Sequence, residues 1–342
     1  MARKALGPAT LEIVQAVRAM ADRGMVVGVS GGADSLALAF AVGYVGRQQQ
    51  LSHAAVTVDH GLQDGSADRA QRVHDQLVGL GFTDIAIRRV EVPQRSGPEA
   101  DARTARYRVL DAEAAQRDAD LYLGHTLDDQ AETVLLGLAR GSGTRSLAGI
   151  APRSGRKIRP LLGVRRAATR ACCTELGLEV WDDPHNTDPR FTRSRLRQRL
   201  LPVLEDDLGP GVAEALARTA ELARVDADLL DRLAEDLYQA TRIGEDDSDL
   251  DPDESPCRES SSSTPGLDCS ILATADPALR GRVIKRWLGD CGATDISQRH
   301  VRAVELLIID WHGQREVQLP GVAVHRRCGV LRSSTPRPES KR

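Results

Sequence analysis

The fold of this chain is decided by the stretch Met25-Val26-Val27-Gly28-Val29-Ser30-Gly31-Gly32-Ala33-Asp34-Ser35. A short run of Met and Val bounded by glycine is typical of a parallel strand that is buried on both faces. The small residues that follow let backbone N–H groups approach an anion closely, and glycine tolerates the dihedral angles of a tight turn. The apolar residues after Ser35 predict a helix, whose free N–H groups and positive dipole end would face the same anion. The stretch therefore predicts a phosphate-binding strand–turn–helix unit.

Two common phosphate-binding motifs do not fit this turn. The P-loop needs a Lys after its last glycine, and the dinucleotide fingerprint needs G-x-G-x-x-G, which Gly28, Gly31 and Gly32 do not match. A glycine-rich turn without a ligand is the alternative. Against it, Asp34 lies inside the turn, where a carboxylate suits a phosphate only if Mg²⁺ separates the two negative charges.

The hexapeptide S-G-G-A-D-S resembles the motif of the PP-loop family, whose members are ATP pyrophosphatases that cleave ATP to AMP and pyrophosphate. The resemblance sets the reaction class but not the substrate. It implies that ATP binds with Mg²⁺ near Asp34 and that the ATP-binding residues are Ser30, Gly31, Gly32, Ala33, Asp34 and Ser35.

Composition favours a soluble, cytoplasmic protein with two domains or one domain with appendages. Aromatic residues make up only 3% of the 342 residues, so Ala, Leu and Val must form the core. No apolar run approaches the ~20 residues of a membrane span, and the N-terminus does not have the regions of a secretory signal. Residues 245–259 hold eight acids and one Arg, so the rest of the chain carries +4 although the total is −3. Arginine clusters at 153–170 and 190–199 favour a polyanionic partner such as RNA.

Strands alternate with helices in the first part of the chain. This order predicts an α/β fold with a doubly wound parallel sheet, whose ligands bind at the carboxyl ends of the strands. Polar clusters at 30–35, 59–61 and 124–132 each follow a predicted strand, so we expect them to meet in one crevice. The predicted strands are 25–29, 54–58, 85–92 and 121–123.

Beyond residue 145 the alternation fades, and composition suggests further segments. Acidic and Ser-rich residues predict a disordered insertion, and two amphipathic helices with a hairpin predict a small α+β domain. The expected organisation is a catalytic domain at 1–205, a helical linker at 206–243, the insertion at 244–270, the small C-terminal domain at 271–334 and a disordered tail at 335–342.

A His and two carboxylates follow the fourth predicted strand. His125 precedes the next helix, and Asp129 and Glu132 are three residues apart and so share one helix face. Such a group can hold Mg²⁺, or receive a cationic amine and accept its proton. The alternative is a helix whose first turn is capped by acidic residues.

Arginines on two further helices complete the candidate site. Arg106 shares helical spacing with Arg103 and Tyr107, although an ion pair on a solvated face would explain Arg103 alone. Arg197 lies in an Arg-rich helix behind the polar loop 183–188. Guanidinium groups fork onto phosphate oxygens, so both helices suit a phosphate ligand.

Motifs in one order over residues 25–205 resemble those of the tRNA(Ile)-lysidine synthetase family. Three positions depart from the family pattern: Asp59 and Gln63 stand where Asn and Arg are common, and Ser194 replaces an Asn. The motifs are S-G-G-A-D-S, V-D-H-G-L, E-A-x-A-R-x-x-R-Y, L-G-H-T-x-D-D-Q-A-E-T, R-P-L-L, D-P-H-N-x-D and R-S-R-L-R.

The resemblance implies ATP-dependent ligation of free L-lysine to C2 of the wobble cytidine in the CAU anticodon of an isoleucine tRNA. The reaction would pass through an adenylated cytidine and release pyrophosphate and AMP. The C-terminal domain would hold the tRNA body, and a homodimer is left open. The implied catalytic residues are Asp34, Arg106, His125, Asp129, Glu132 and Arg197, with the separate roles of the His and the two α-helical carboxylates not assigned.

Other functions remain open from the residues alone. A PP-loop tRNA thiolase would need paired reactive cysteines, whereas Cys172 and Cys173 are adjacent in a predicted helix and point to opposite sides. Another adenylating ligase would not need the Arg clusters or the C-terminal domain. A non-catalytic RNA- or nucleotide-binding protein would not need Asp34 or Glu132, and both are present.

Overall fold

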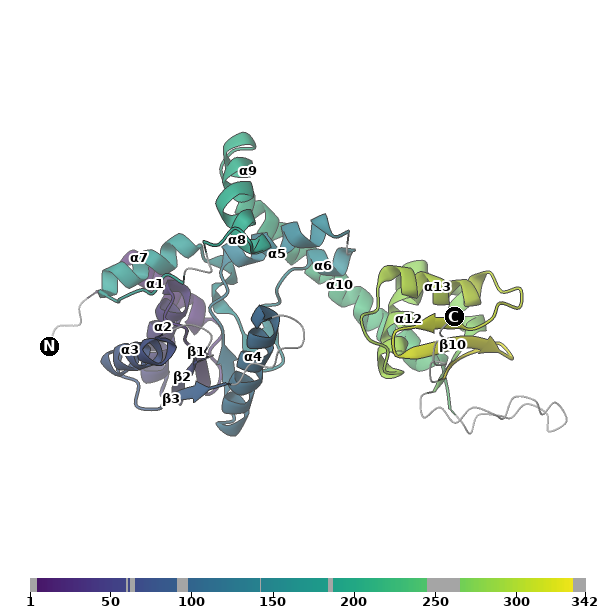
Figure 1. Cartoon of the computed structure of the whole chain (residues 1–342), viewed down its shortest axis with the longest axis horizontal. Helices are drawn as coiled ribbons and strands as arrows, with labels where there is room; N and C mark the ends of the chain where they lie inside the picture. Colours follow the sequence, from purple (N-terminus) through teal and green to yellow (C-terminus); the bar gives the residue numbers. More distant parts are fainter. Residues whose placement is uncertain are drawn as a thin grey trace. The chain divides into compact units, whose positions relative to one another are not determined.

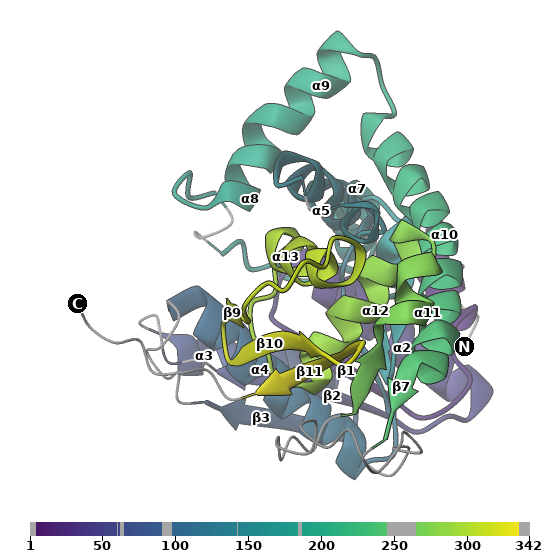
Figure 2. The same cartoon turned by 90° about the vertical axis from the view of Figure 1, so that its right-hand side faces the viewer.

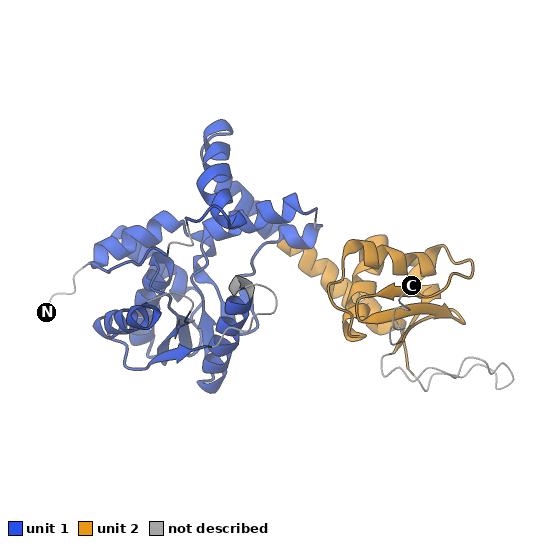
Figure 3. Ribbon diagram, viewed as in Figure 1, with its two compact units in different colours: residues 1–223 blue, residues 224–342 orange. Residues whose placement is uncertain are grey.

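The computed structural model describes residues 5–59, 61, 65–90, 98–141, 143–183, 187–244 and 265–334, with the backbone alone at 98–100. The chain forms two compact units, residues 1–223 and 224–342 (Figure 3). The 30-residue helix α10 (Val212–Thr241) contributes residues to both units. The predicted tail 335–342 and residues 245–264 of the predicted insertion lie outside the described residues.

Unit 1 is built on a six-stranded sheet with the order β3-β2-β1-β4-β6-β5. All neighbouring strands are parallel except β5, which pairs antiparallel with β6 at the edge. The predicted parallel sheet is confirmed. Strands β5 and β6 were not predicted, because a two-residue strand is too short to show a sequence pattern. The strands are β1 (Met25–Gly28), β2 (His53–Asp59), β3 (Ile85–Arg89), β4 (Asp120–Tyr122), β5 (Arg153–Ser154) and β6 (Lys157–Ile158).

Helices cover both faces of this sheet, as a doubly wound fold requires (Figure 1). Alternate residues of β1 serve the two faces: Val27 packs in the cluster formed with α1, α2, α3 and α7, whereas Val26 packs with Leu110 of α4. The helices are α1 (Pro8–Arg18), α2 (Ala33–Gln49), α3 (Ser66–Gly79), α4 (Pro98–Gln116), α5 (Leu127–Ala139), α6 (Thr144–Leu147) and α7 (Arg166–Leu176).

The predicted Arg-rich helix that carries Arg197 is present, but a π-helical turn interrupts it. Helix α8 (Thr192–Arg195) continues through the π-helical turn Leu196–Leu200 into α9 (Leu201–Asp207). A π turn inserts one residue and so rotates the side chains that follow. A small cluster formed by Leu127, Ala131, Leu201 and Ala213 joins α5, α9 and the start of α10.

Unit 2 has a five-stranded antiparallel sheet with the order β7-β8-β11-β10-β9. Helix α13 packs on β9 and β10, and α12 packs on α13 (Figure 2). The elements are β7 (Arg242–Ile243), β8 (Gly266–Asp268), α11 (Cys269–Thr274), α12 (Pro277–Asp290), α13 (Gln298–Ile309), β9 (Val317–Leu319), β10 (Val322–Arg327) and β11 (Val330–Ser334).

One predicted boundary is wrong. The sequence predicts a disordered insertion up to residue 270, whereas Gly266–Asp268 form β8 and Cys269 begins α11. Leu267 and Cys269 are buried in the core of unit 2, and β8 bridges β7 and β11. Apolar burial therefore orders this segment despite its Ser-rich flank. The predicted α+β class of the C-terminal domain is confirmed.

In the part of the chain that the structure describes, no helix is both long enough and apolar enough to cross a membrane.

Candidate active site

A cavity of about 660 Å³ lies at the carboxyl ends of the central strands of unit 1. Most residues singled out from the sequence line it: Ser30, Gly32, Ala33, Asp34, Ser35, Arg106, His125, Asp129 and Arg197. Gly31 and Glu132 do not line the cavity, but Glu132 touches residues that do. Of the three polar clusters expected to meet in one crevice, those at 30–35 and 124–132 both contribute residues to this cavity. From the third cluster, 59–61, Asp59 and Gly61 do not line the cavity, and His60 lies outside the described residues.

The turn after β1 is held together by the hydroxyl of Ser35. Its Oγ accepts the N–H of Ser30 at 3.1 Å and donates to the carbonyl of Gly32 at 2.9 Å. Gly31 has φ +88°, and a Cβ there would lie 2.9 Å from Cγ2 of Val73, so only glycine fits. Gly32 is the N-cap of α2 and has no side chain to cap the first N–H groups, which leaves them for an anion.

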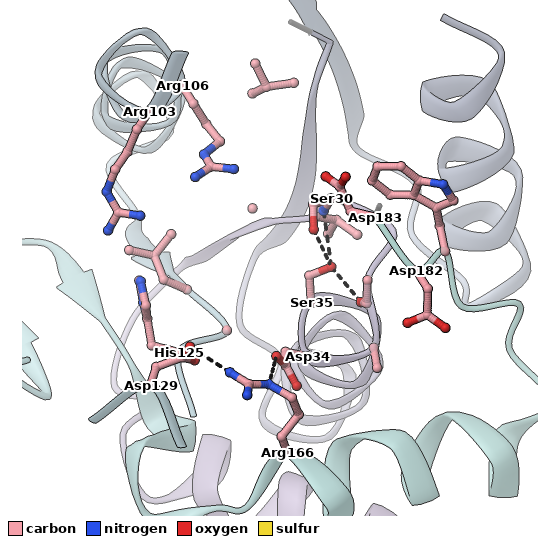
Figure 4. Close-up of a pocket in the computed structure, with 18 of the residues that line it drawn as sticks. Ser30, Asp34, Ser35, Arg103, Arg106, His125, Asp129, Arg166, Asp182 and Asp183 are labelled. Atoms are coloured by element: carbon pink, nitrogen blue, oxygen red, sulfur yellow. Dashed lines mark hydrogen bonds and ion pairs between the residues drawn. The ribbon is translucent and has the colours of Figure 1, made fainter. Parts of the chain in front are cut away.

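Arg166 joins three carboxylates from two helices, and Figure 4 shows two of them, those of Asp34 and Asp129. Its Nε lies 3.3 Å from Oδ2 of Asp34, its Nη2 lies 2.7 Å from Oδ1 of Asp129, and its Nη1 lies 3.5 Å from Oε1 of Glu132. The hydroxyl of Thr169 donates to the other oxygen of Asp34. The first turns of α2, α5 and α7 are thus joined around one guanidinium group.

Glu132 is fully buried and is contacted by arginines from two helices. Nε of Arg197 donates to its Oε1 at 2.8 Å, and Nη1 of Arg193 lies 4.0 Å from its Oε2. Among the described residues, Oε2 has no hydrogen-bond partner. A buried carboxylate oxygen with unused acceptor capacity is costly and favours a cationic ligand.

Asp129 serves two roles at once. Its Oδ2 accepts the backbone N–H of Thr126 at 2.8 Å in a capping box, so the predicted cap of this helix is present. Its Oδ1 faces Arg166 instead. Burial of Asp129 opposes ionisation, but Arg166 and the Thr126 N–H outweigh it and lower the pKa of the carboxyl.

His125 and Asp34 have shifted pKa values because both are largely buried. Burial lowers the pKa of His125 to about 4, so its imidazole is neutral at pH 7. Its Nε2 lies 3.5 Å from Oη of Tyr107, and its Nδ1 has no hydrogen-bond partner among the described residues. Burial likewise raises the pKa of Asp34, although Arg166 and Thr169 favour the ionised form.

Helix α4 supplies positive charge to the same cavity. Figure 4 shows the side chains of Arg103 and Arg106 extending from this helix, and both line the cavity. Nη2 of Arg103 lies 3.3 Å from Oη of Tyr107. A neutral histidine thus lies beside a phenol and close to guanidinium groups.

Sequence patterns miss three residues of this site. Arg166 falls within a predicted basic cluster, and only its position four residues after the R-P-L-L motif could have marked it. Thr169 and Trp181 belong to no motif and carry no charge that would single them out in the sequence. The backbone N–H of Trp181 donates to the carbonyl of Gly31 at 3.0 Å, and the guanidinium of Arg69 lies 3.7 Å from its ring.

A metal site made by the protein alone is not found in the described part of the chain, because no three His, Cys, Asp or Glu side chains group suitably. Asp34 lies in the first turn of α2, where Arg166 and Thr169 contact its carboxylate. Mg²⁺ usually takes one or two protein carboxylates and completes its shell with phosphate oxygens and water. Asp34 fits that pattern.

The adjacent cysteines of α7 are packed into the core. Cys172 and Cys173 are both buried, and burial raises the pKa of the Cys172 thiol and that of Cys173 to about 12. Thiols in this state are neither nucleophiles nor metal ligands. This pair does not suit the cysteine chemistry expected of a thiolase.

Comparison with known proteins matches residues 8–204 to the PP-loop domain and residues 267–331 to the TilS substrate binding domain. Residues 8–204 of unit 1 therefore form a PP-loop domain. Two similar curated proteins are the tRNA(Ile)-lysidine synthases of Leifsonia xyli subsp. xyli and Salinispora tropica. The first is 48% identical over 90% of this chain and 88% of that protein, and the second 45% over 97% and 98%. The chain belongs to the tRNA(Ile)-lysidine synthase family.

The structure of the U34-tRNA thiolase NcsA from Methanococcus maripaludis is similar with a TM-score of 0.53 and 18% identity. The match covers 63% of this chain and 79% of that chain, and it shows a shared fold alone.

Proposed function

We propose that this chain joins free L-lysine to C2 of the wobble cytidine of an isoleucine tRNA with a CAU anticodon, at the expense of ATP. The observation that carries the proposal is one cavity lined both by residues of the anion-binding turn 30–35 and by Asp129, next to the buried Glu132, which contacts the cavity residues Arg166 and Arg197. The turn suits ATP, and the two carboxylates suit an amine. Family membership makes the tRNA the expected third reactant.

The first half of the reaction takes place at the turn. Backbone N–H groups of residues 30–35 bind the ATP phosphates, aided by the positive end of α2. Mg²⁺ held by Asp34 would neutralise charge on the phosphates. O2 of the cytidine attacks the α-phosphate, a P–O bond forms, and pyrophosphate leaves with its bonding electron pair. Arg106 stabilises the negative charge that develops.

The second half uses the carboxylates of α5. Asp129 and Glu132 receive the ε-ammonium group of lysine, and the candidates for accepting its proton are these two carboxylates and His125. The freed amine attacks C2 of the adenylated cytidine, a C–N bond forms, and AMP leaves with the original O2. Arg197, which contacts Glu132, places positive charge near the departing phosphate.

The tRNA body would be bound outside the cavity. Unit 2 would hold the tRNA body, in keeping with its match to a substrate binding domain. A cytoplasmic location stays a prediction, and whether the protein forms a homodimer stays open. The buried cysteines disfavour the thiolase alternative, and the second unit disfavours a ligase that acts on small molecules only.

Release of pyrophosphate and AMP from ATP tests the proposal. We expect pyrophosphate release to require a tRNA with a CAU anticodon and AMP release to require lysine as well. A transcript whose only change is GAU for CAU is the matched control, because it removes the reacting cytidine. Binding of the CAU tRNA without any pyrophosphate release would refute the enzyme function.

A further inference from the structure

Arg166 occupies a position that the proposed reaction does not yet use. Its side chain is only 17% exposed, and its three nitrogen atoms contact carboxylates on two helices. Asp34 lies at the ATP-binding turn, whereas Asp129 and Glu132 lie on α5. By comparison, Arg197 contacts the two carboxylates on α5.

The start of α7 fixes where this guanidinium group lies. The backbone N–H of Arg166 donates to Oδ2 of Asp128 at 2.8 Å, which attaches α7 to the first turn of α5. The hydroxyl of Thr169 contacts both the carbonyl of Arg166, at 2.8 Å, and the carboxylate of Asp34. The side chain is therefore held from both helices that it bridges.

Charge explains what such a bridge can do for an amine substrate. Arg166 contacts Asp34, Asp129 and Glu132, Arg197 contacts the two carboxylates of α5, and Nη1 of Arg193 lies 4.0 Å from Oε2 of Glu132. Oε2 of Glu132 has no hydrogen-bond partner among the described residues, so it is an acceptor left for an ammonium group. A planar guanidinium can contact three carboxylates along fixed directions, which a lysine side chain cannot do.

We propose that Arg166 is a positioning residue for the lysine-dependent half of the reaction. It holds Asp129 and Glu132 in the orientation that receives the ε-ammonium group and keeps them at a fixed distance from Asp34. The amine bound at the carboxylates of α5 is thereby held at a fixed position relative to the adenylated cytidine. This inference rests on the proposed function.

The test measures KM and kcat for each substrate in Arg166→Lys and Arg166→Gln. Arg166→Lys keeps the charge but not the triple contact, so we expect a rise of about tenfold in the KM for lysine, with kcat and the KM for tRNA changed less than about threefold. Arg166→Gln should raise the KM for lysine further, to about 100-fold. Arg166→Lys carries the test if Arg166→Gln does not fold.

Arg165→Gln is the matched control, because Arg165 is the neighbouring arginine and contacts Asp128 and Glu214 instead. It should leave the KM for lysine unchanged. An unchanged KM for lysine in Arg166→Lys, or an equal rise in the KM for all three substrates, would overturn the positioning role. A wild-type protein that never joins lysine to tRNA would instead overturn the proposed function, and this inference with it.

Discussion

Nε of Arg197 lies 2.8 Å from Oε1 of Glu132, so the π-helical turn between α8 and α9 reaches a fully buried carboxylate of α5. The contact spans 65 positions of the sequence. It joins a helix that sequence patterns favour for phosphate binding with a carboxylate that they favour for binding an amine or Mg²⁺. The two expected functions of the cavity therefore share an ion pair.

Glu132→Gln should abolish most lysine transfer while leaving ATP binding nearly intact. The amide keeps the shape of the side chain but loses the charge that pairs with Arg197 and receives the amine. We expect kcat/KM for lysine to fall by at least about 100-fold, or roughly 3 kcal/mol, and the Kd for ATP to change less than about threefold. Equal losses for both substrates would show that Glu132 only supports the fold.

Gly31→Ala should damage the fold of the turn 30–35, which we propose binds ATP. The residue has φ +88°, and its Cβ would meet Cγ2 of Val73 at 2.9 Å. Strain of this kind costs about 1–3 kcal/mol, which thermal unfolding would register as a lower Tm. Pyrophosphate release should fall with it.

Gly32→Ala separates the fold of this turn from its ligand. A Cβ at Gly32 would lie no closer than 3.7 Å to any neighbour, so stability should stay within about 0.5 kcal/mol of wild type. ATP phosphates on the turn would nevertheless meet that methyl group, and the Kd for ATP should rise by about tenfold. An unchanged Kd for ATP would place the phosphates elsewhere.

The buried His125 should make unit 1 sensitive to mild acid. Its pKa is about 4 when folded, below the value of 6.5 for an exposed histidine, so the unfolded chain binds an extra proton between these pH values. The stabilising contribution is complete above pH 6.5 and is lost as the pH falls towards 4.

Urea unfolding at pH 7.0 and 4.5 tests this sign. Wild type should lose about 2 kcal/mol more than His125→Gln over this range. His312→Gln, at a histidine whose side chain is 72% exposed, should behave like wild type. An equal loss in wild type and His125→Gln would contradict a neutral buried imidazole.

Removal of residues 245–264 should leave activity intact. Ile243 pairs with Gly266 and Arg242 with Leu267 in an antiparallel ladder, so the ends to be joined are already adjacent. An Asn-Gly turn between Gly244 and Pro265 can close the ladder at little cost in loop entropy. We expect lysine incorporation within about twofold of wild type, whereas a tenfold fall would show contact with the active site or the tRNA. A Gly/Ser segment of equal length is the control for charge.

The central sheet and the conformation of the turn 30–35 could be predicted because local patterns determine them. Buried runs such as Val26–Val29 and glycines such as Gly31 reflect requirements that lie within a few residues. The two-residue strands β5 and β6 carry no such pattern. Strand β8 was missed because the Ser-rich residues before it dominate the composition of the window.

The candidate site was predictable in part for the same reason. Asp129 and Glu132 share a helix face, and the spacing shows this directly. Arg166 could not be found in this way, because its contact with Asp34 spans 132 positions and depends on how α7 packs against α2 and α5. The burial that makes His125 neutral is likewise a property of the folded chain.

Incorporation of labelled lysine into tRNA with a CAU anticodon tests the central claim most directly. The assay contains ATP and Mg²⁺ and compares wild type with Asp34→Ala, whose carboxylate adjoins the turn that is expected to bind ATP. The account predicts incorporation by the wild type and none by the variant. Pyrophosphate release by the wild type without any incorporation of lysine would contradict it, since the PP-loop chemistry would then serve another nucleophile.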